Sequence, residues 1–376
     1  MSPHRQSTDL AAGKRIVVKI GSALLVDQER GTVHRRWLEG LAEDLADLHR
    51  QGKEIVIVSS GAIAVGRRYL SFTDKQLRLE EKQAAAATGM VHLAHAYQET
   101  LARHDMTVAQ VLLTIDDTEN RRRYINARNT LSTLMHLRAV PLINENDTVA
   151  TEEIRVGDND RLGARVAAMI SADTLVLLSD IDGLYSADPR ADAGARLIPE
   201  VRAINPEIEA MAGTANVGDG TGGMITKLAA AKIAMGAGCR MVITDGRQER
   251  PLRRLLDGAS RTWFLPSSTP RTARKGWIAG SLKPTGSITL DAGAVAALGK
   301  GKSLLPAGVT AVSGRFERGD AVLVLGPDGK ELGRGLSAYS SADAERIIGH
   351  KTSEIEATLG YRGRDEMIHR DDLVLN

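Results

Sequence analysis

A ten-residue stretch, 218–227 (GDGTGGMITK), combines glycines, hydroxyls and a lysine in a way that suits phosphate binding. Each glycine costs about 0.5 to 1 kcal/mol inside a regular element, so their density here favours backbone that approaches a ligand closely. An Ala-rich helical pattern, 224–237, follows and would place the free N–H groups of its first turn beside the glycines. Lys227 would add an ammonium group. The stretch predicts a phosphate site, and a flexible Gly-rich connector is the alternative that its composition leaves open.

This stretch fits neither of the two commoner nucleotide-binding motifs. Three of its glycines match GxGxxG, but that fingerprint should follow a strand, and the preceding residues 206–215 have a helical pattern. The GKS tripeptide of the chain begins at Gly301, and Ala296 stands where a P-loop requires glycine. We therefore reject both the dinucleotide fingerprint and the P-loop.

Lys19 lies inside an apolar run, 15–20 (RIVVKI), that predicts a buried strand. A lysine is rarely buried without an anionic partner. The sequence therefore predicts either a carboxylate near Lys19 or a strand-end lysine that reaches water.

Two clusters of acids and amides flank the middle of the chain. The residues 144–147 (NEND) follow a predicted strand, 140–143, and the residues 157–160 (GDND) precede a predicted helix, 161–171. Helix capping explains Asp158 and also Asn159, but not both clusters. We expect them to converge at one edge of a sheet as a functional site.

The elements that must position these residues alternate between strand and helix patterns. Such an alternation predicts an α/β fold in which helices cover both faces of a parallel sheet, with ligands bound beyond the carboxyl ends of the strands. Gly21, Ser60 and Asp180 fall at such strand ends. The predicted strands are 15–20, 54–59, 107–114, 140–143, 174–178 and 240–244, and the main predicted helices are 33–51, 83–104, 161–171, 224–237 and 252–256.

Composition narrows the class of protein. The 376 residues are 43% hydrophobic and 3% aromatic, and 49 Lys+Arg against 47 Asp+Glu give a net charge of +2. This charge provides no general attraction to nucleic acid or to an anionic membrane. Cys239 is the only cysteine, and there is neither a signal-peptide pattern nor a long apolar run. We therefore expect a cytoplasmic protein that does not bind a membrane.

Patterning changes after residue 251 and suggests a second domain. Residues 251–283 contain seven Lys/Arg and one acid, whereas the following segment alternates short apolar runs with Gly turns, which is typical of a small β-rich domain. We predict a flexible tail at 1–13, a first domain at 14–258, a linker at 259–283, a β-rich domain at 284–365 and a tail at 366–376.

The combination of a phosphate loop, a strand-end lysine and carboxylate clusters suggests phosphoryl transfer. Lys19 and Lys227 would neutralise the transferring group, and Mg²⁺ held by Asp160 or Asp180 would assist. No motif for covalent catalysis or for a kinase-type base is present. A carboxylate acceptor needs no base, because it is already ionised at neutral pH. The expected product is an acyl phosphate.

Six segments then resemble the amino acid kinase family, and in particular its glutamate-phosphorylating branch, in the order of that family. Residues from 284 to about 365 look like the PUA domain that many bacterial members carry. The resemblance implies a three-layer, parallel-sheet kinase fold followed by a small PUA-like domain. The segments are VVKIG at 17–21, VSSGAIAVG at 58–66, NARNTL at 126–131, PLINENDTVATEEIRVGDND at 141–160, LLSDIDGLYSADPR at 177–190 and GTGGMITK at 220–227.

The resemblance implies ATP-dependent phosphorylation of the γ-carboxylate of L-glutamate, with Mg²⁺, in a homo-oligomer that proline inhibits by feedback and whose product passes to glutamyl phosphate reductase. It assigns residues by motif. The glutamate-binding residues are Ser60, Asp147 and Asn159; the nucleotide-binding residues are Lys19, Ser179, Asp180, Thr221, Gly222, Gly223, Met224, Ile225, Thr226 and Lys227. With the phosphoryl-transfer chemistry above, the expected catalytic residues are Lys19, Asp160 and Lys227.

Two alternatives stay open. PUA domains commonly bind RNA, so the chain could be an RNA-binding factor with a degenerate kinase domain. Residues 284–376, however, carry 11 Lys/Arg and 13 Asp/Glu, a net charge of −2, and an RNA site normally needs a basic surface. Nucleic-acid binding is therefore not expected. The other alternative is a kinase of the same fold that acts on aspartate, N-acetylglutamate, carbamate or uridylate.

Overall fold

The computed structural model describes residues 8–73, 76–149, 158–213, 223–281 and 283–376. The chain divides into two units: the first comprises Met1–Glu119 and Asn126–Pro270, and the second comprises Asn120–Ile125 and Arg271–Asn376. Each unit has its own sheet and its own hydrophobic core.

An eight-stranded sheet forms the centre of the first unit, in the order β3-β4-β2-β1-β5-β9-β10-β8. Neighbouring strands are parallel except for β9 and β10, which are antiparallel. The strands are β1 (Arg15–Ile20), β2 (Glu54–Val58), β3 (Val108–Leu113), β4 (Val140–Glu145), β5 (Thr174–Ser179), β8 (Glu200–Val201), β9 (Arg240–Asp245) and β10 (Arg261–Phe264).

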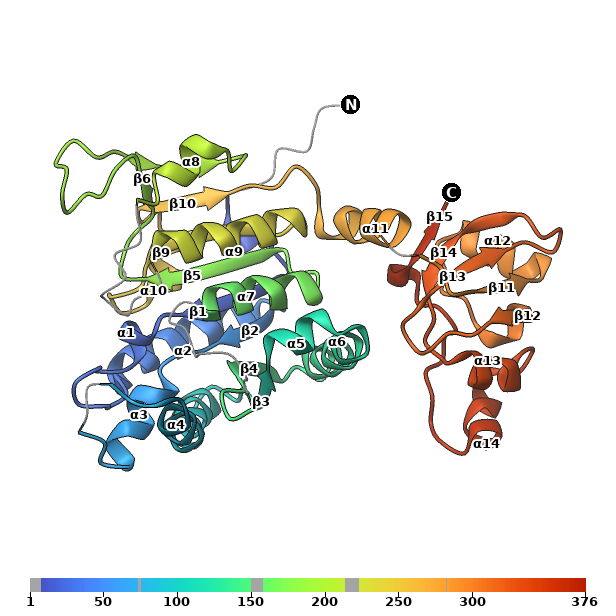
Figure 1. The fold of residues 1–376 in the computed structure, drawn as a ribbon, viewed down its shortest axis with the longest axis horizontal. Coiled ribbons are helices and arrows are strands. Elements are labelled where there is room, and N and C mark those ends of the chain that lie inside the picture. Colours follow the sequence, from blue (N-terminus) through green and yellow to red (C-terminus); the bar gives the residue numbers. More distant parts are fainter. Residues whose placement is uncertain (1–7, 74–75, 150–157, 214–222, 282) are drawn as a thin grey trace. The chain divides into compact units, whose positions relative to one another are not determined.

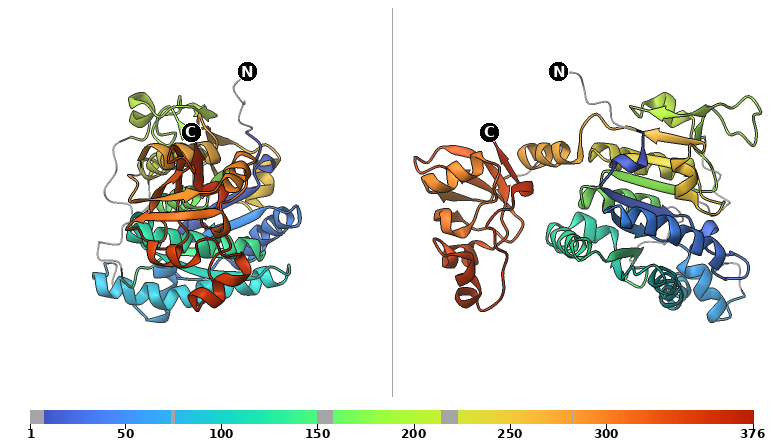
Figure 2. Two further views of the ribbon diagram at one scale, coloured as in Figure 1. Left: turned by 90° about the vertical axis from the view of Figure 1, so that its right-hand side faces the viewer. Right: turned by 180° about the vertical axis from the view of Figure 1, so that it is seen from behind.

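Helices cover both faces of this sheet (Figure 1; Figure 2, right). On one face lie α7 (Asp158–Met169) and α9 (Met224–Gly236), which pack against each other and against β1, β5 and β9. On the other face lie α2 (Arg35–Arg50), α4 (Leu79–Ala102) and α10 (Pro251–Leu256). The predicted three-layer α/β architecture is confirmed.

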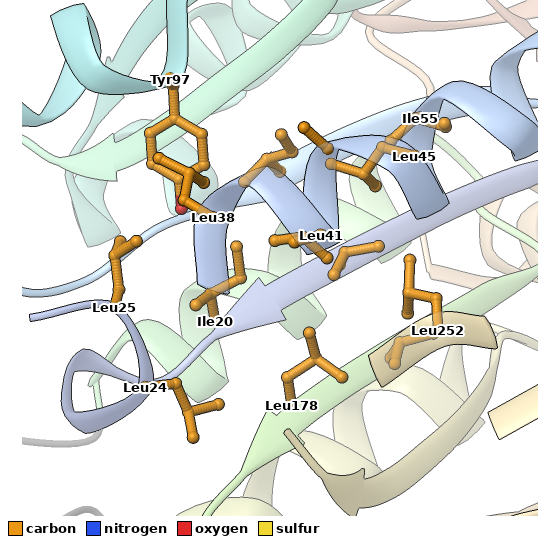
Figure 3. Packing of buried hydrophobic residues seen from close by; sticks show 14 of the residues in the cluster. Ile20, Leu24, Leu25, Leu38, Leu41, Leu45, Ile55, Tyr97, Leu178 and Leu252 are labelled. Atoms are coloured by element: carbon orange, nitrogen blue, oxygen red, sulfur yellow. The ribbon is translucent and has the colours of Figure 1, made fainter. Parts of the chain in front are cut away.

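The side chains of β1 alternate between the two layers, as the two-residue period of a strand requires. Ile16, Val18 and Ile20 are fully buried in the cluster formed with α2, α4 and α10. Figure 3 shows Ile20 in this cluster. Burial of each such side chain contributes about 1.5 to 3 kcal/mol. Lys19 points the other way, toward α7, where a Cβ at Gly163 would lie 3.4 Å from the Lys19 Cβ. The strand therefore delivers a lysine to the opposite layer from its own core residues.

Shorter elements complete the first unit. The helices are η1 (Leu10–Ala12), α1 (Ser22–Leu25), α3 (Ala62–Tyr69), α5 (Ile115–Glu119), α6 (Arg121–His136) and α8 (Pro206–Ala210). The strands β6 (Leu184–Tyr185) and β7 (Leu197–Ile198) form a separate two-stranded sheet. The helix α6 begins in the short stretch that groups with the second unit.

Some elements differ from their predicted bounds. The strand β4 runs on to Glu145, so half of the NEND cluster belongs to the strand itself. The helix α7 begins at Asp158 and so includes three residues of the GDND cluster. The helix expected at 206–215 ends at Ala210, and Gly213 adopts a left-handed conformation with a φ of 70°. Residues 214 and 215 lie outside the described residues.

Parts of the predicted linker and tails have regular structure. Within 259–283, β10 pairs with β9 and α11 spans Pro270–Ser281, and within the first 13 residues Leu10 is buried. Near the C-terminus β15 (Leu373–Leu375) pairs with β14. The exact domain limits stay a prediction.

The second unit contains a five-stranded sheet, in the order β12-β11-β13-β14-β15, around an aliphatic core. Its elements include β11 (Gly286–Leu290), α12 (Ala292–Gly299), η2 (Pro306–Gly308), β12 (Val309–Gly314), β13 (Ala321–Leu325), β14 (Glu331–Leu336), α13 (Ser341–Ile347), η3 (Thr352–Glu354), α14 (Ile355–Leu359) and η4 (Arg370–Asp372). A small β-rich domain was predicted here, and this prediction is confirmed. Among the residues described, no helix combines the length and the apolar character needed to cross a membrane.

Candidate active site

The carboxyl ends of five neighbouring strands meet at one edge of the large sheet, because β4, β2, β1, β5 and β9 are all parallel. Backbone hydrogen bonds continue beyond the strands and hold the first residues of the loops. Gly21 N donates to Leu178 O at 3.2 Å, and Gly246 N donates to Ser179 O at 2.7 Å. The loops that carry the predicted site residues therefore leave the sheet from one ordered edge.

Asp160 is the centre of the site. It lies in the first turn of α7 with 1% of its surface exposed. The Lys19 Nζ, from β1, lies 2.6 Å from its Oδ1, and the Lys227 Nζ, from α9, lies 3.3 Å from its Oδ2. The carboxylate predicted near Lys19 is therefore Asp160, and the alternative of a water-exposed, strand-end lysine is wrong.

Lys19, Asp160 and Lys227 form a triad in which the pKa of the Asp160 carboxyl is lowered. Burial would raise the pKa of the Asp160 carboxyl, but the two ammonium groups and their hydrogen bonds outweigh burial and hold that pKa below its ordinary value. Two lysines and one aspartate leave one net positive charge. Since Lys19 and Lys227 are each 7% exposed, this charge acts in a partly desolvated site, where electrostatic interactions are stronger than in water.

The start of α9 brings the second lysine to the triad. Gly223 is the N-cap residue of α9, and as a glycine it has no side chain with which to cap the helix. The hydroxyl of Thr226 lies 3.2 Å from Asp160 Oδ2 and 2.9 Å from Gly223 O, so it can donate to either acceptor. Met224 and Ile225 occupy the first turn of α9. The predicted site residues Thr221 and Gly222 lie outside the described residues, as does most of the glycine loop.

Ser60 and Asn159 come together from different layers. Asn159, next to Asp160 on α7, donates from its Nδ2 to the Ser60 Oγ at 2.9 Å. Ser60 follows β2, and Gly61 after it has a φ of 99°, a left-handed turn that suits glycine and starts α3. Two of the three residues predicted to bind glutamate are therefore in direct contact.

The end of β4 supplies further buried polar groups. Asp147 is 6% exposed, and Asn144 is 5% exposed. The side-chain oxygens of Asn144 and Asn159 are both buried without a hydrogen-bond partner among the residues that the structure describes. A buried acceptor without a donor costs about 1 to 3 kcal/mol, which a bound ligand with donors would recover. Neither the residue pattern nor the family resemblance assigns an individual role to Asn144, although its place in the NEND motif, at a strand end, indicates one.

Ser179 and Asp180 lie at the carboxyl end of β5, which pairs with β1, the strand that carries Lys19. Ser179 is buried, and its Oγ donates to Asp180 Oδ1 at 3.1 Å. Asp180 itself is exposed. This arrangement leaves a carboxylate at the sheet edge with access to solvent and to a ligand.

The donor set indicates how a magnesium ion would be accommodated. Within the described part of the chain, no group of three or more His, Cys, Asp or Glu side chains lies close enough together to form a metal site. Mg²⁺ commonly uses only one or two carboxylates, with substrate phosphates and water as its other ligands. Both oxygens of Asp160 already face lysines, which makes Asp180 the better ligand of the two predicted.

Comparison with known proteins assigns a family to each part of the chain. Residues 14–245 match the amino acid kinase family, and residues 286–359 match the PUA domain. The chain is 66% identical to a glutamate 5-kinase of Paramagnetospirillum magneticum over 366 residues, 97% of this chain and 99% of that protein. Proteins of the same name from Rhodospirillum rubrum and Dinoroseobacter shibae are 60% and 58% identical, over 96% and 97% of this chain and 96% and 99% of their own lengths. The chain therefore belongs to the amino acid kinase family and carries a PUA domain after its kinase domain.

Proposed function

We propose that this protein transfers the γ-phosphoryl group of ATP to the γ-carboxylate of L-glutamate, which yields ADP and L-glutamyl 5-phosphate, the first step of proline biosynthesis. The convergence of Lys19 and Lys227 on Asp160 is the observation that carries phosphoryl transfer. The acceptor follows from relatives named glutamate 5-kinase that are 58 to 66% identical over nearly the whole chain.

The two lysines would stabilise the charge of the transferring phosphoryl group. The bond from the γ-phosphorus to the ADP oxygen breaks while a bond to a glutamate carboxylate oxygen forms. Little covalent chemistry is left to the protein, so positioning and charge dominate catalysis. Asp160 holds two like charges side by side, and their net charge of +1 faces the phosphates. No general base is needed, because a free glutamate carboxylate has a pKa of about 4.3.

The cluster around Asn159 would hold the amino-acid end of glutamate. The α-ammonium group has three N–H donors. It would contact the Asp147 carboxylate and the amide oxygens of Asn144 and Asn159, which have no hydrogen-bond partner within the described part of the chain. Ser60, already paired with Asn159, has a hydroxyl for a substrate carboxylate. This arrangement would orient the γ-carboxylate toward the lysines.

The nucleotide would bind between the carboxyl end of β5 and the amino end of α9. At the start of α9, Gly223, Met224 and Ile225 would direct backbone N–H groups at the phosphates, and Thr226, whose N–H donates to Gly223 O, would offer its hydroxyl. Thr221 and Gly222, which lie outside the described residues, complete the proposed phosphate site. Ser179 and Asp180 would line the other side of this site. Mg²⁺, when bound, would neutralise charge on the β- and γ-phosphate oxygens, with Asp180 as its protein ligand.

An acyl phosphate reacts with hydroxylamine to give a hydroxamate, which forms a coloured complex with ferric ion, so the product can be trapped directly. Turnover with L-glutamate, ATP and Mg²⁺ should exceed turnover with L-aspartate, N-acetyl-L-glutamate, carbamate or uridylate, the last two followed by ADP release. Removal of Mg²⁺ with EDTA should abolish turnover with L-glutamate. A preference for any other acceptor would overturn the assigned substrate.

Several expectations rest on the resemblance to the family and on the lone cysteine. They are a homo-oligomer, a cytoplasmic location, feedback inhibition by proline and delivery of the labile product to glutamyl phosphate reductase. Sedimentation of the purified protein and titration of its activity with proline test the two that concern the protein alone.

A further inference from the structure

A pair of buried hydroxyl groups lies directly behind the turn that carries Ser60. The Tyr97 Oη, from α4, lies 3.2 Å from the Oγ of Ser59, and either atom can donate. Tyr97 is fully buried, and Ser59 is 1% exposed. A buried hydroxyl is costly unless it is hydrogen-bonded, and a phenylalanine would fill the same space without that cost. The contact between Tyr97 and Ser59 therefore calls for a role beyond packing.

Ser59 is the residue through which the position of Ser60 is fixed. Its backbone N donates to Ile143 O on β4 at 2.9 Å, which continues the pairing of β2 with β4. Its side chain is held from the opposite side by Tyr97. Ser60 follows at once and accepts the hydrogen bond from Asn159. A shift of the Ser59 side chain would therefore be passed to the Ser60–Asn159 contact.

The helix that carries Tyr97 is itself held against the helix that begins after Ser60. A Cβ at Gly66 of α3 would lie 1.7 Å from Ala85 O, and a Cβ at Gly89 of α4 would lie 1.8 Å from Ala62 O. These two helices thus pack backbone to backbone, which leaves little freedom for either. The ring of Tyr97 projects from α4 into the core cluster beside Leu38 (Figure 3).

We propose that Tyr97 is a positioning residue for glutamate, whose hydroxyl holds Ser59 so that Ser60 and Asn159 keep the geometry that the substrate requires. This proposal rests on the proposed function. Burial raises the pKa of the Tyr97 hydroxyl, and the hydrogen bond with Ser59 offsets this only partly, so the group stays neutral and acts through its hydrogen bond.

The test is Tyr97→Phe in the full-length protein, with initial rates measured against glutamate and ATP separately. We expect the KM for glutamate to rise about threefold to tenfold, the range that one hydrogen bond accounts for, with the KM for ATP and kcat unchanged. The matched control is Thr100→Val, one turn further along α4. It also removes a buried hydroxyl, one that donates to Ala96 O at 2.7 Å, away from the site. This control should alter the melting temperature at most.

Ser59→Ala tests the same contact from its other side and replaces Tyr97→Phe if that variant does not fold. If Tyr97 acts through Ser59, the double variant should have the same KM for glutamate as either single variant. Additive effects on KM, or equal effects of Tyr97→Phe and Thr100→Val, would overturn the proposal. A wild-type protein that does not phosphorylate glutamate would instead overturn the proposed function, so the two failures are distinguishable.

Discussion

The Lys19 ammonium lies 2.6 Å from the Asp160 carboxylate, and this contact joins the central strand of the sheet to the first turn of a helix in the next layer. The same carboxylate holds Lys227, so two like charges stay close together in a site that is almost closed to solvent. The geometry makes Asp160 the organiser of both lysines. Its replacement should affect catalysis and stability together.

Asp160→Asn keeps the shape of the side chain and removes its charge. We expect kcat to fall by at least about 100-fold, the scale seen when one preorganised electrostatic group is lost. The variant should also lose about 3 to 5 kcal/mol of unfolding free energy, because it removes the carboxylate charge that pairs with two buried ammonium groups. Hydroxamate assays and urea unfolding measure the two effects. Asp257→Asn, which breaks an exposed pair with Arg253, should change neither.

The lowered pKa of Asp160 predicts how this stability depends on pH. Its ionised form contributes fully above the pKa of an unfolded aspartate, about 3.9, and the contribution is lost as the pH falls through the lower pKa of the folded protein. The difference in unfolding free energy between wild type and Asp160→Asn should therefore be largest at neutral pH and shrink below about pH 4. A difference that stays constant down to pH 2 would contradict an ionised Asp160.

Lys227→Met should abolish turnover while the protein stays folded. The lysine would act mainly on charge that develops in the transition state, so its loss should appear in kcat by about 100-fold or more. Circular dichroism and the hydroxamate assay separate folding from activity. Lys232→Met is the control, since it lies on the same helix, pairs with Glu209 at the surface and should keep full activity. A Lys227→Met enzyme within about tenfold of the wild-type rate would remove this lysine from the mechanism.

The sequence predicted which residues belong to this site better than it predicted which of them contact each other. An isolated lysine in an apolar strand requires an anion by simple electrostatics, so the need for a partner of Lys19 was readable. That the partner is Asp160 depends on how α7 packs on β1, and no local pattern records this. Tyr97 was missed for a related reason. A single aromatic residue on an Ala-rich helix predicts core packing, and its hydrogen bond with Ser59 depends on contacts between distant segments.

The same holds for the fold: elements with a clear local sequence pattern were predicted, and elements that depend on distant segments were not. The run RIVVKI has a continuous apolar pattern and forms β1 with the predicted bounds, from Arg15 to Ile20. The four-residue β10 lies in a basic segment that suggested a linker, and it is a strand only because β9 and β8 pair with it. Short strands of this kind are specified by their neighbours in the sheet rather than by their own residues.

Asp147→Ala should raise the KM for glutamate by about 100-fold or more while the KM for ATP stays unchanged. The expected cause is the loss of a buried carboxylate that pairs with the α-ammonium group of the substrate, a charge-assisted interaction. Thr148→Ala is the neighbouring control, because the Thr148 hydroxyl donates to the Asn146 side chain at the surface and has no expected contact with glutamate. An unchanged KM for glutamate in Asp147→Ala would exclude Asp147 from the substrate site.

The full-length protein should not bind RNA in a filter-binding assay, even at low salt. Sequence-independent RNA binding requires cationic side chains that displace counterions from phosphates, and residues 284–376, with 11 Lys/Arg and 13 Asp/Glu, have a net charge of −2. The test uses a mixed pool of labelled RNA, with a basic RNA-binding protein as the positive control. Retention that falls steeply as salt rises would show a cationic RNA site. Such a site would have to include the basic segment 251–283, where seven Lys/Arg face one acid, and a Lys/Arg→Gln scan of that segment would then locate it.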